Sequence, residues 1–160
     1  MNDEILNTIT KDTFTLTLLK HRLRILKSNL LKKIFGSEAP AEQLSVQEAN
    51  WLSSLPASFY QKFNKDNVYQ IFDAIETKIN SMPVLLIYIA FEADDQTIYQ
   101  IGMNLKKSFT SITLFDIKVN PALIAGCALS FGGIYRDYSL KAKIEDKKSE
   151  ILESFKKFLR

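Results

Sequence analysis

The chain has 160 residues, 46% of them hydrophobic and 24% charged, which suits one folded domain or two small ones. Its 21 basic and 18 acidic residues leave a net charge of only +3, which disfavours a nucleic-acid-binding role unless the cations gather on one face. Cys127 is the only cysteine, which excludes an intrachain disulfide and a Cys-based metal cluster and indicates a reducing compartment.

The first predicted element is a helix from about Thr13 to Phe35. Its leucines recur at alternating three- and four-residue spacing, which places them on one stripe of a helix. Asp12 is the expected N-cap and Gly36 the expected C-terminal stop. Cations occupy the opposite face, either as a solvated surface or as a docking surface for an acidic partner segment. They are Lys20, Arg24 and Lys27.

A loop and one or two short helices are predicted next. The polar stretch from Ser37 to Glu42 predicts the loop. The stretch from Leu44 to Phe63 predicts the helices, interrupted at Pro56. Its large apolar residues fall close to helical spacing, and we expect them in the core. They are Trp51, Leu52, Leu55, Phe59 and Phe63.

A domain boundary is predicted near residue 82. A helix from about Asp66 to Ile79 ends before Pro83, because proline disfavours helix in the residue before it. Beyond this break the pattern changes from helical repeats to short apolar runs. We therefore expect a helical domain over residues 1–82 and an α+β domain over residues 83–160.

The second domain is predicted to begin with a strand, a helix and a strand. The run from Val84 to Phe91 is rich in β-branched and aromatic residues and predicts a buried strand. Asp94 and Asp95 open a helix to about Phe109, because acidic residues suit the first turn. The alternating stretch from Thr113 to Val119 predicts a second strand. The inward residues expected for the helix are Ile98, Ile101, Met103 and Leu105.

A hairpin and a long helix are predicted to complete the domain. A third strand is expected from Ile124 to Phe131, and Gly126 within it indicates a bulge or a close backbone approach. Gly132 and Gly133 supply the turn, and a helix runs from about Ser139 to the end. The predicted fold class is α+β, an N-terminal helical part followed by a small mixed sheet with a hairpin and flanking helices.

The last predicted helix carries large apolar residues at about helical spacing. Fully burying such a side chain contributes about 1.5 to 3 kcal/mol. They are therefore expected to be covered, either by the chain's own sheet or by a partner. These residues are Leu140, Ile144, Ile151, Phe155 and Phe158.

Residues for chemistry are sparse. His21 is the only histidine and has no cysteine or paired acids near it in the sequence, so a metal site is not expected. No glycine-rich phosphate loop is present. Helix capping explains Asp94 and Asp95, and packing in an apolar strand explains Cys127. We expect no catalytic, cofactor or metal site, and therefore no enzyme.

Membrane insertion and secretion are not predicted. The residues from Met1 to Glu4 are acidic and lead into no apolar run, so no signal peptide is expected. The run from Val84 to Phe91 is far shorter than the roughly 20 residues of a spanning helix. Any contact with a membrane is expected to be through partners.

One ordered set of residues is more distinctive than any single motif. It combines a turn, a short apolar segment ending in glycine, a Gly-Gly hairpin turn and a helix cap provided by Asp137 or Ser139. The set is Asn120-Pro121, Leu123-Ile124-Ala125-Gly126, Gly132-Gly133 and Asp137-Tyr138-Ser139.

This order resembles the C-terminal domain of the delta subunit of F-type ATP synthase, the family of the oligomycin-sensitivity-conferring protein. The family pattern has Leu-Ile-Gly-Gly, a hairpin with a Gly-containing turn, and Asp-x-Ser before a helix. Ala125 stands where the family usually has its first Gly. The resemblance extends back to Val84 and covers about the last half of the chain.

The resemblance implies a non-catalytic stator subunit of a rotary proton-translocating synthase, at the cytoplasmic face of the inner (plasma) membrane. It would link the catalytic head to the b-subunit stalk and resist rotation. In the family the C-terminal region receives the C-terminal helices of the b subunits, in a helix-in-groove mode. The stalk-binding residues implied here are Gly126, Asp137, Ser139, Leu140, Ile144, Ile151, Phe155 and Phe158.

The family's N-terminal domain is a six-helix bundle that grips the N-terminal tails of the head's α subunits. Here about eighty residues leave room for four short helices, and the family's opening helix signature is not found. The implied contacts with the α/β head are Lys20, Arg24 and Lys27.

Three alternatives to the F-type delta subunit stay open at this point. The E subunit of V-type and archaeal ATPases ends with a similar hairpin and an Asp-x-(Ser/Thr)-Leu stretch. A nucleic-acid-binding module could use the basic faces around Lys20 to Lys33 and Lys141 to Lys157, although no nucleic-acid partner is expected. A small enzyme would need carboxylates that the sequence does not pair.

Overall fold

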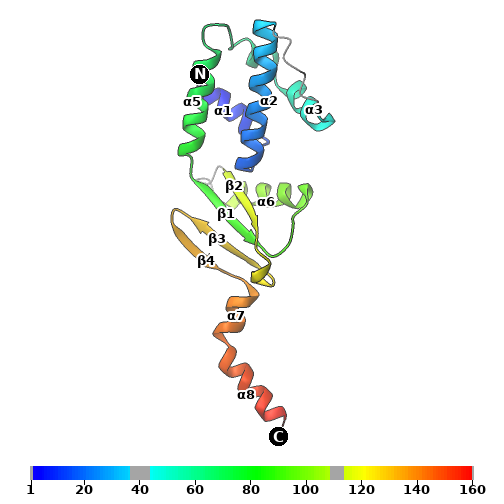
Figure 1. Ribbon diagram of the computed structural model, residues 1–160, viewed down its shortest axis with the longest axis vertical. Helices are drawn as coiled ribbons and strands as arrows, with labels where there is room; N and C mark the ends of the chain where they lie inside the picture. The colour runs from blue at the N-terminus through cyan, green and yellow to red at the C-terminus, as the bar shows by residue number, and fades with distance from the viewer. Residues whose placement is uncertain (1, 37–43, 109–113, 160) are drawn as a thin grey trace. The chain divides into compact units, whose positions relative to one another are not determined.

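The computed structural model describes residues 2–36, 44–108 and 114–159. The chain divides into two compact units, Met1–Met82 and Pro83–Arg160 (Figure 1). The regular structure of the described residues consists of helices and one four-stranded sheet, which confirms the predicted α+β class.

Five helices form the described part of the first unit. The prediction allowed for about four, and it did not include the first of them. A loop predicted from Ser37 to Glu42 lies outside the described residues. The helices are α1 (Asn2–Thr10), α2 (Leu16–Phe35), α3 (Val46–Ser54), α4 (Ala57–Tyr60) and α5 (Val68–Ser81).

Helix α2 begins later than predicted. Thr15 is its N-cap, and the Thr15 hydroxyl accepts a hydrogen bond from the Leu18 N–H at 3.2 Å. Asp12, the expected cap, lies in the preceding turn, where its carbonyl oxygen accepts from the Arg22 guanidinium at 2.9 Å. The predicted stop is confirmed, because Gly36 has a φ of 64° and its N–H donates to a carbonyl of the last turn.

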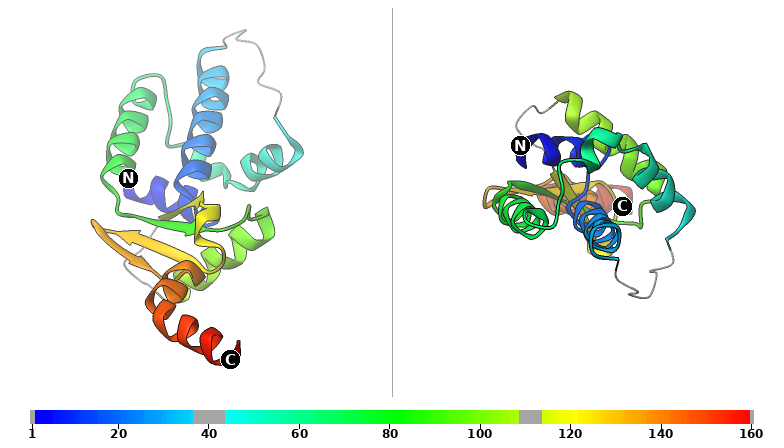
Figure 2. Two further views of the ribbon diagram at one scale, coloured as in Figure 1. Left: turned by 60° about the horizontal axis from the view of Figure 1, so that its bottom comes forward. Right: turned by 90° about the horizontal axis from the view of Figure 1, so that it is seen from above.

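The first helix is held by its neighbours on both sides. It contacts α2 and α5, as both general views show (Figures 1 and 2). Its buried face carries Ile5 and Ile9. An ion pair joins Asp3 to Lys78, and a second joins Glu4 to Lys62 at 2.8 Å. Tertiary contacts therefore stabilise a helix whose own sequence is short.

The core of the first unit is apolar and contains a cluster of phenylalanine rings. Pro56 separates α3 from α4, as predicted. Phe63 stacks on Phe72 with ring centroids 5.8 Å apart, and Phe59 lies 5.4 Å from Phe63. All five apolar residues predicted for the middle segment are buried. They are Trp51, Leu52, Leu55, Phe59 and Phe63.

The second unit contains a mixed sheet in the order β2-β1-β3-β4. Strand β1 (Val84–Ile89) pairs parallel with β2 (Leu114–Val119) and antiparallel with β3 (Cys127–Phe131). Strand β4 (Ile134–Asp137) pairs antiparallel with β3 across the Gly-Gly turn. In β1, every second side chain is buried. One edge of the sheet is formed by β2 and the other by β4, whose residues are all exposed.

Helix α6 (Asp95–Ser108) follows β1, and its inward face differs from the prediction at one position. Met103 is exposed, whereas Gly102 is buried. The half-buried residues are Ile98, Ile101 and Leu105, so the inward stripe includes Gly102 at the helical spacing of three and four residues. Met103 lies about 100° round the helix from that position.

Two predicted boundaries in the last third of the chain are wrong. The third strand begins at Cys127 and not at Ile124, because Pro121–Leu123 forms a short 3-10 helix (η1) after β2. The last helix is broken at Lys147 into α7 (Leu140–Asp146) and α8 (Lys148–Phe158), and no glycine or proline marks this break. Both helices lead away from the sheet (Figure 1).

Candidate functional site

The distinctive segment of the second unit begins where β2 ends. The Asn120 N–H donates to the Ile89 carbonyl at 2.7 Å, and the Asn120 side chain accepts from the Ala122 N–H at 3.2 Å. These bonds stop the strand and start η1, as the sequence predicted for a turn at Asn120 and Pro121. The buried side chain of Leu123 then fixes the end of η1 in the core.

The residue after η1 has an unusual backbone. Ile124 has φ 67° and ψ −55°, and the Ala125 N–H donates to the Leu123 carbonyl at 2.8 Å. These values define a γ-turn of the rare, strained kind. The sequence did not predict this turn.

Gly126 makes the close backbone approach that the sequence predicted, although it precedes β3 and is not inside it. It has a φ of 80°, and a Cβ atom there would lie 2.7 Å from the Tyr138 carbonyl oxygen. The neighbouring Ala125 carbonyl accepts from the Leu140 N–H at 2.8 Å. The chain before β3 is therefore joined, backbone to backbone, to the chain after β4.

Ser139 caps α7, one of the two alternatives left open by the sequence. It is fully buried, and its hydroxyl accepts from the Ala142 N–H at 3.2 Å. The Ser139 N–H donates to the Asp137 carboxylate at 2.8 Å. Hydrogen bonds from Ser139, first from its hydroxyl and then from its backbone, hold the pKa of Asp137 below its usual range. Ser139 and Asp137 together therefore fix the position of the first turn of α7.

The apolar residues predicted on the last helix are exposed. We call them, across α7 and α8, the C-terminal apolar stripe, and the chain's own sheet does not cover them. Their exposure rises toward the end, from Ile151 to Phe155 (62%) and Phe158 (89%). The stripe consists of Leu140, Ile144, Ile151, Phe155 and Phe158. Leu152 on α8 and Leu159 directly after it are also exposed, although the predicted stripe did not include them.

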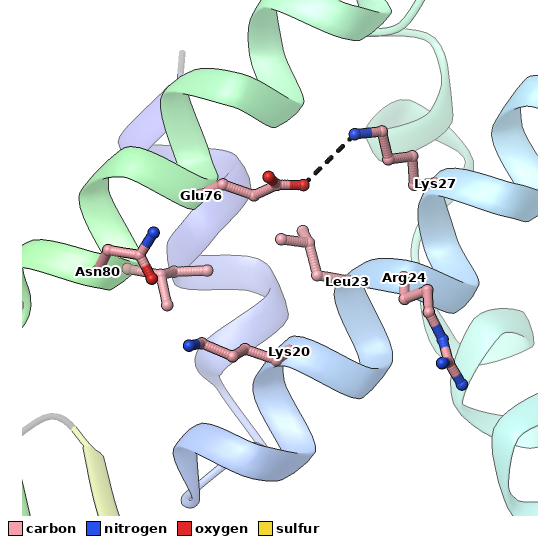
Figure 3. A pocket seen from close by; sticks show the side chains of 7 residues that line it. Lys20, Leu23, Arg24, Lys27, Glu76 and Asn80 are labelled. Atoms are coloured by element: carbon pink, nitrogen blue, oxygen red, sulfur yellow. Dashed lines mark hydrogen bonds and ion pairs between the residues drawn. The ribbon is translucent and has the colours of Figure 1, made fainter.

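A second candidate surface is a groove between α2 and α5 in the first unit (Figure 3). Its volume is about 430 Å³, and Leu23 and Ile79 supply its apolar surface. Lys20, Arg24 and Lys27 line one side, and Glu76 and Asn80 line the other. The α2 side of the groove is therefore basic, and the α5 side carries one carboxylate, that of Glu76.

The three predicted cations are arranged differently. Lys27 lies across the groove from Glu76, with 3.4 Å between Nζ and Oε1. Lys20 points toward α5, whereas the guanidinium of Arg24 points away from the groove (Figure 3). The Arg24 guanidinium lies 3.5 Å from the His21 ring. Glu76 was missed because it is 49 residues away from Lys27 in the sequence.

His21 has an acidic neighbour that the sequence did not predict. Its Nε2 atom lies 2.5 Å from the Glu48 carboxylate, which also accepts from the Ser45 N–H at 2.6 Å. The hydrogen bond to His21, followed by those from Ser45, lowers the pKa of Glu48. This contact fixes the start of α3. The described residues contain no group of three or more His, Cys, Asp or Glu placed to hold a metal ion.

No helix among the described residues has both the length and the apolar character needed to span a membrane. What the fold and its surfaces define is a helical unit followed by an α+β unit that ends in an exposed amphipathic helix.

The family model for the ATP synthase delta (OSCP) subunit matches residues 27–151, and the chain belongs to this family. It is a family of structural, peripheral-stalk subunits of the membrane-associated ATP synthase. The match covers parts of both units, whereas the sequence resemblance extended only from Val84 onward. The sequence resembles two families of stalk subunits, the F-type delta subunit and the V/A-type E subunit. The family match supports the F-type delta subunit. No individual curated protein matches the chain significantly.

Proposed function

We propose that this subunit links the catalytic head of the synthase to its b-subunit stalk and resists rotation of the head, without catalysis of its own. The second unit binds the C-terminal helices of the b subunits, and the first unit binds the α-subunit tails. The protein works at the cytoplasmic face of the inner (plasma) membrane, held there by its partners. The family match and the two surfaces described above support this assignment.

The observation that carries the proposal is the exposure of the C-terminal apolar stripe. An exposed phenylalanine gains about 1.5 to 3 kcal/mol when a partner buries it fully. Phe155 and Phe158 lie with Ile151 around a shallow hollow on α8, which suits the apolar face of another helix. Lysines near the stripe, such as Lys148 and Lys156, favour a partner helix that carries acids beside its apolar face.

Substitutions on α8 test the stalk contact. Phe155→Ser removes an exposed ring from the stripe, and Phe91→Ser removes an equally exposed ring elsewhere in the same unit (62% and 59% exposed). We expect Phe155→Ser to weaken binding of the b subunits about tenfold or more, and Phe91→Ser to leave it unchanged. Affinity for purified b subunits, measured by calorimetry, is the readout. Equal effects of the two variants would remove the stripe from the interface.

The groove between α2 and α5 is the proposed contact with the head. Its apolar floor suits an amphipathic helical tail, and its cations favour acids on that tail. Lys20→Glu places an acid in the groove, and Lys65→Glu makes the same charge change outside it. We expect only Lys20→Glu to release the head from this subunit, and its difference from wild type to shrink as the salt concentration rises, because salt screens the charge. Co-purification of the α and β subunits with the tagged variants measures this.

A further inference from the structure

Ile124 is held in a backbone conformation that its side chain disfavours. A β-branched residue with positive φ is an outlier, because its Cβ crowds the backbone. Within the described part of the chain, every other residue with positive φ is a glycine. A glycine at this position would adopt the γ-turn without that steric cost. The isolated chain is therefore less stable with isoleucine here.

Burial does not offset this strain. The Ile124 side chain is 60% exposed, whereas the neighbouring Leu123 is buried in the core. The isoleucine side chain therefore adds little to the stability of the fold. The surrounding backbone nevertheless holds this residue in the strained turn. Strained residues of this kind cluster at functional sites, where the surrounding structure holds them in place.

The turn is fixed beside the first turn of α7. The Ala125 carbonyl accepts from the Leu140 N–H, and the backbone of Gly126 lies against Tyr138 and Ser139. Leu140 is itself exposed, as is Ile144 one turn further along α7. Ile124 is therefore held next to the start of the C-terminal apolar stripe.

Charges beside the stripe define the chemistry of a partner. At about 100° per residue, Leu140 and Ile144 share one face of α7, and Lys141 and Lys143 lie on opposite sides of it. Glu145 lies 4.0 Å from Lys141, at the limit of an ion pair, and the described residues include no acid paired with Lys143. An apolar strip flanked by lysines fits an amphipathic helix whose apolar strip is flanked by acids.

We propose that Ile124 is an anchor residue that inserts into the apolar face of such a helix from the stalk, and that the strained turn exists to present it. This inference rests on the proposed stalk-binding function. It assigns to one residue opposite effects on the stability of the free chain and on the affinity for the partner.

The experiment compares full-length variants in urea unfolding and in titration with purified b subunits. Ile124→Gly relieves the strain, so its urea midpoint rises by about half a molar, and its affinity for b falls about tenfold. Ile124→Ala keeps a Cβ but is not β-branched, so its affinity falls as in Ile124→Gly while its gain in stability is smaller. Ile134→Ala is the matched control, because Ile134 is 63% exposed on β4. It leaves the affinity unchanged.

The outcomes separate this proposal from the proposed function. If wild type binds b subunits and Ile124→Gly binds equally well, the anchor is overturned and the stalk contact stands. If Ile124→Gly is less stable than wild type, the strain has no functional meaning and the anchor is also overturned. If wild type does not bind b subunits, both proposals fail.

Discussion

The backbone at Gly126 passes so close to Tyr138 that a Cβ atom at residue 126 would lie 2.7 Å from the Tyr138 carbonyl oxygen. The same Cβ would lie 3.2 Å from the Cα of Ser139. No side chain can be accommodated there unless the start of α7 moves. The direction in which α7 leaves the sheet therefore depends on a glycine thirteen positions before the cap of that helix.

Gly126→Ala should destabilise the protein strongly. The alanine meets both an unfavourable φ of 80° and a backbone oxygen that cannot move away easily. We expect the free energy of unfolding to fall by about 2 to 4 kcal/mol. Urea unfolding followed by circular dichroism measures the change.

Gly133→Ala is the matched control for that substitution. Gly133 has nearly the same φ, 81°, but no atom lies within 4 Å of the position of its Cβ. The backbone strain is then the only cost of the alanine, and we expect the free energy of unfolding to fall by about 1 kcal/mol. Equal losses for the two variants would show that the close approach to Tyr138 has no energetic weight.

Ser139→Ala should weaken the start of α7. The hydroxyl of this buried serine accepts a hydrogen bond from the Ala142 N–H. Among the described residues, no other side chain caps this end of α7. We expect a loss of about 1 kcal/mol, together with faster hydrogen exchange of the first α7 amides. Ser149→Ala, on the exposed surface of α8, should change stability by less than about 0.5 kcal/mol. Unchanged exchange in Ser139→Ala would contradict the capping role.

Strong periodicity made some elements predictable from sequence, whereas others depend on contacts far along the chain. Helix α2 was predicted because its leucines repeat over several turns. Helix α1 was not, because its asparagines and threonines have weak helix propensity. It is stabilised by burial of Ile5 and Ile9 and by ion pairs to residues more than fifty positions away.

Some features of the candidate sites were also predictable from the sequence, and others depend on contacts between distant parts of the chain. A glycine in an apolar segment predicted a bulge or a close backbone approach at Gly126, and the second of these is found. The γ-turn at Ile124 was not predictable, because isoleucine has no preference for turns and the turn is imposed by its neighbours. The α5 side of the groove could not be inferred either, since Lys27 and Glu76 meet only through the packing of two helices.

The contribution of Asp137 to stability should depend on pH. Its folded-state pKa lies below the ordinary value of 3.8, because Ser139 donates hydrogen bonds to the charged carboxylate. A lowered folded pKa contributes stability above pH 3.8, and this contribution is lost as the pH falls through the folded pKa. Asp137→Asn should therefore be less stable than wild type at pH 7. The difference should disappear in strong acid.

Urea unfolding at a series of pH values measures this difference. Asp95→Asn provides a control, because Asp95 is exposed in the first turn of α6 and the carboxylate that accepts the Thr97 N–H there is that of Asp94. A wild-type advantage over Asp137→Asn that persists unchanged in strong acid would show that the charge on Asp137 does not matter.

Truncation of two phenylalanines should change stability by very different amounts. Phe72 is fully buried and stacks on Phe63, so Phe72→Ala should cost about 3 to 5 kcal/mol of unfolding free energy. Phe158 is 89% exposed at the end of α8, so Phe158→Ser should change that free energy by less than about 0.5 kcal/mol. Urea unfolding of both variants provides the comparison. A large loss in Phe158→Ser would mean that the C-terminal apolar stripe belongs to the fold of the free chain, and a small one leaves its apolar surface available for a partner.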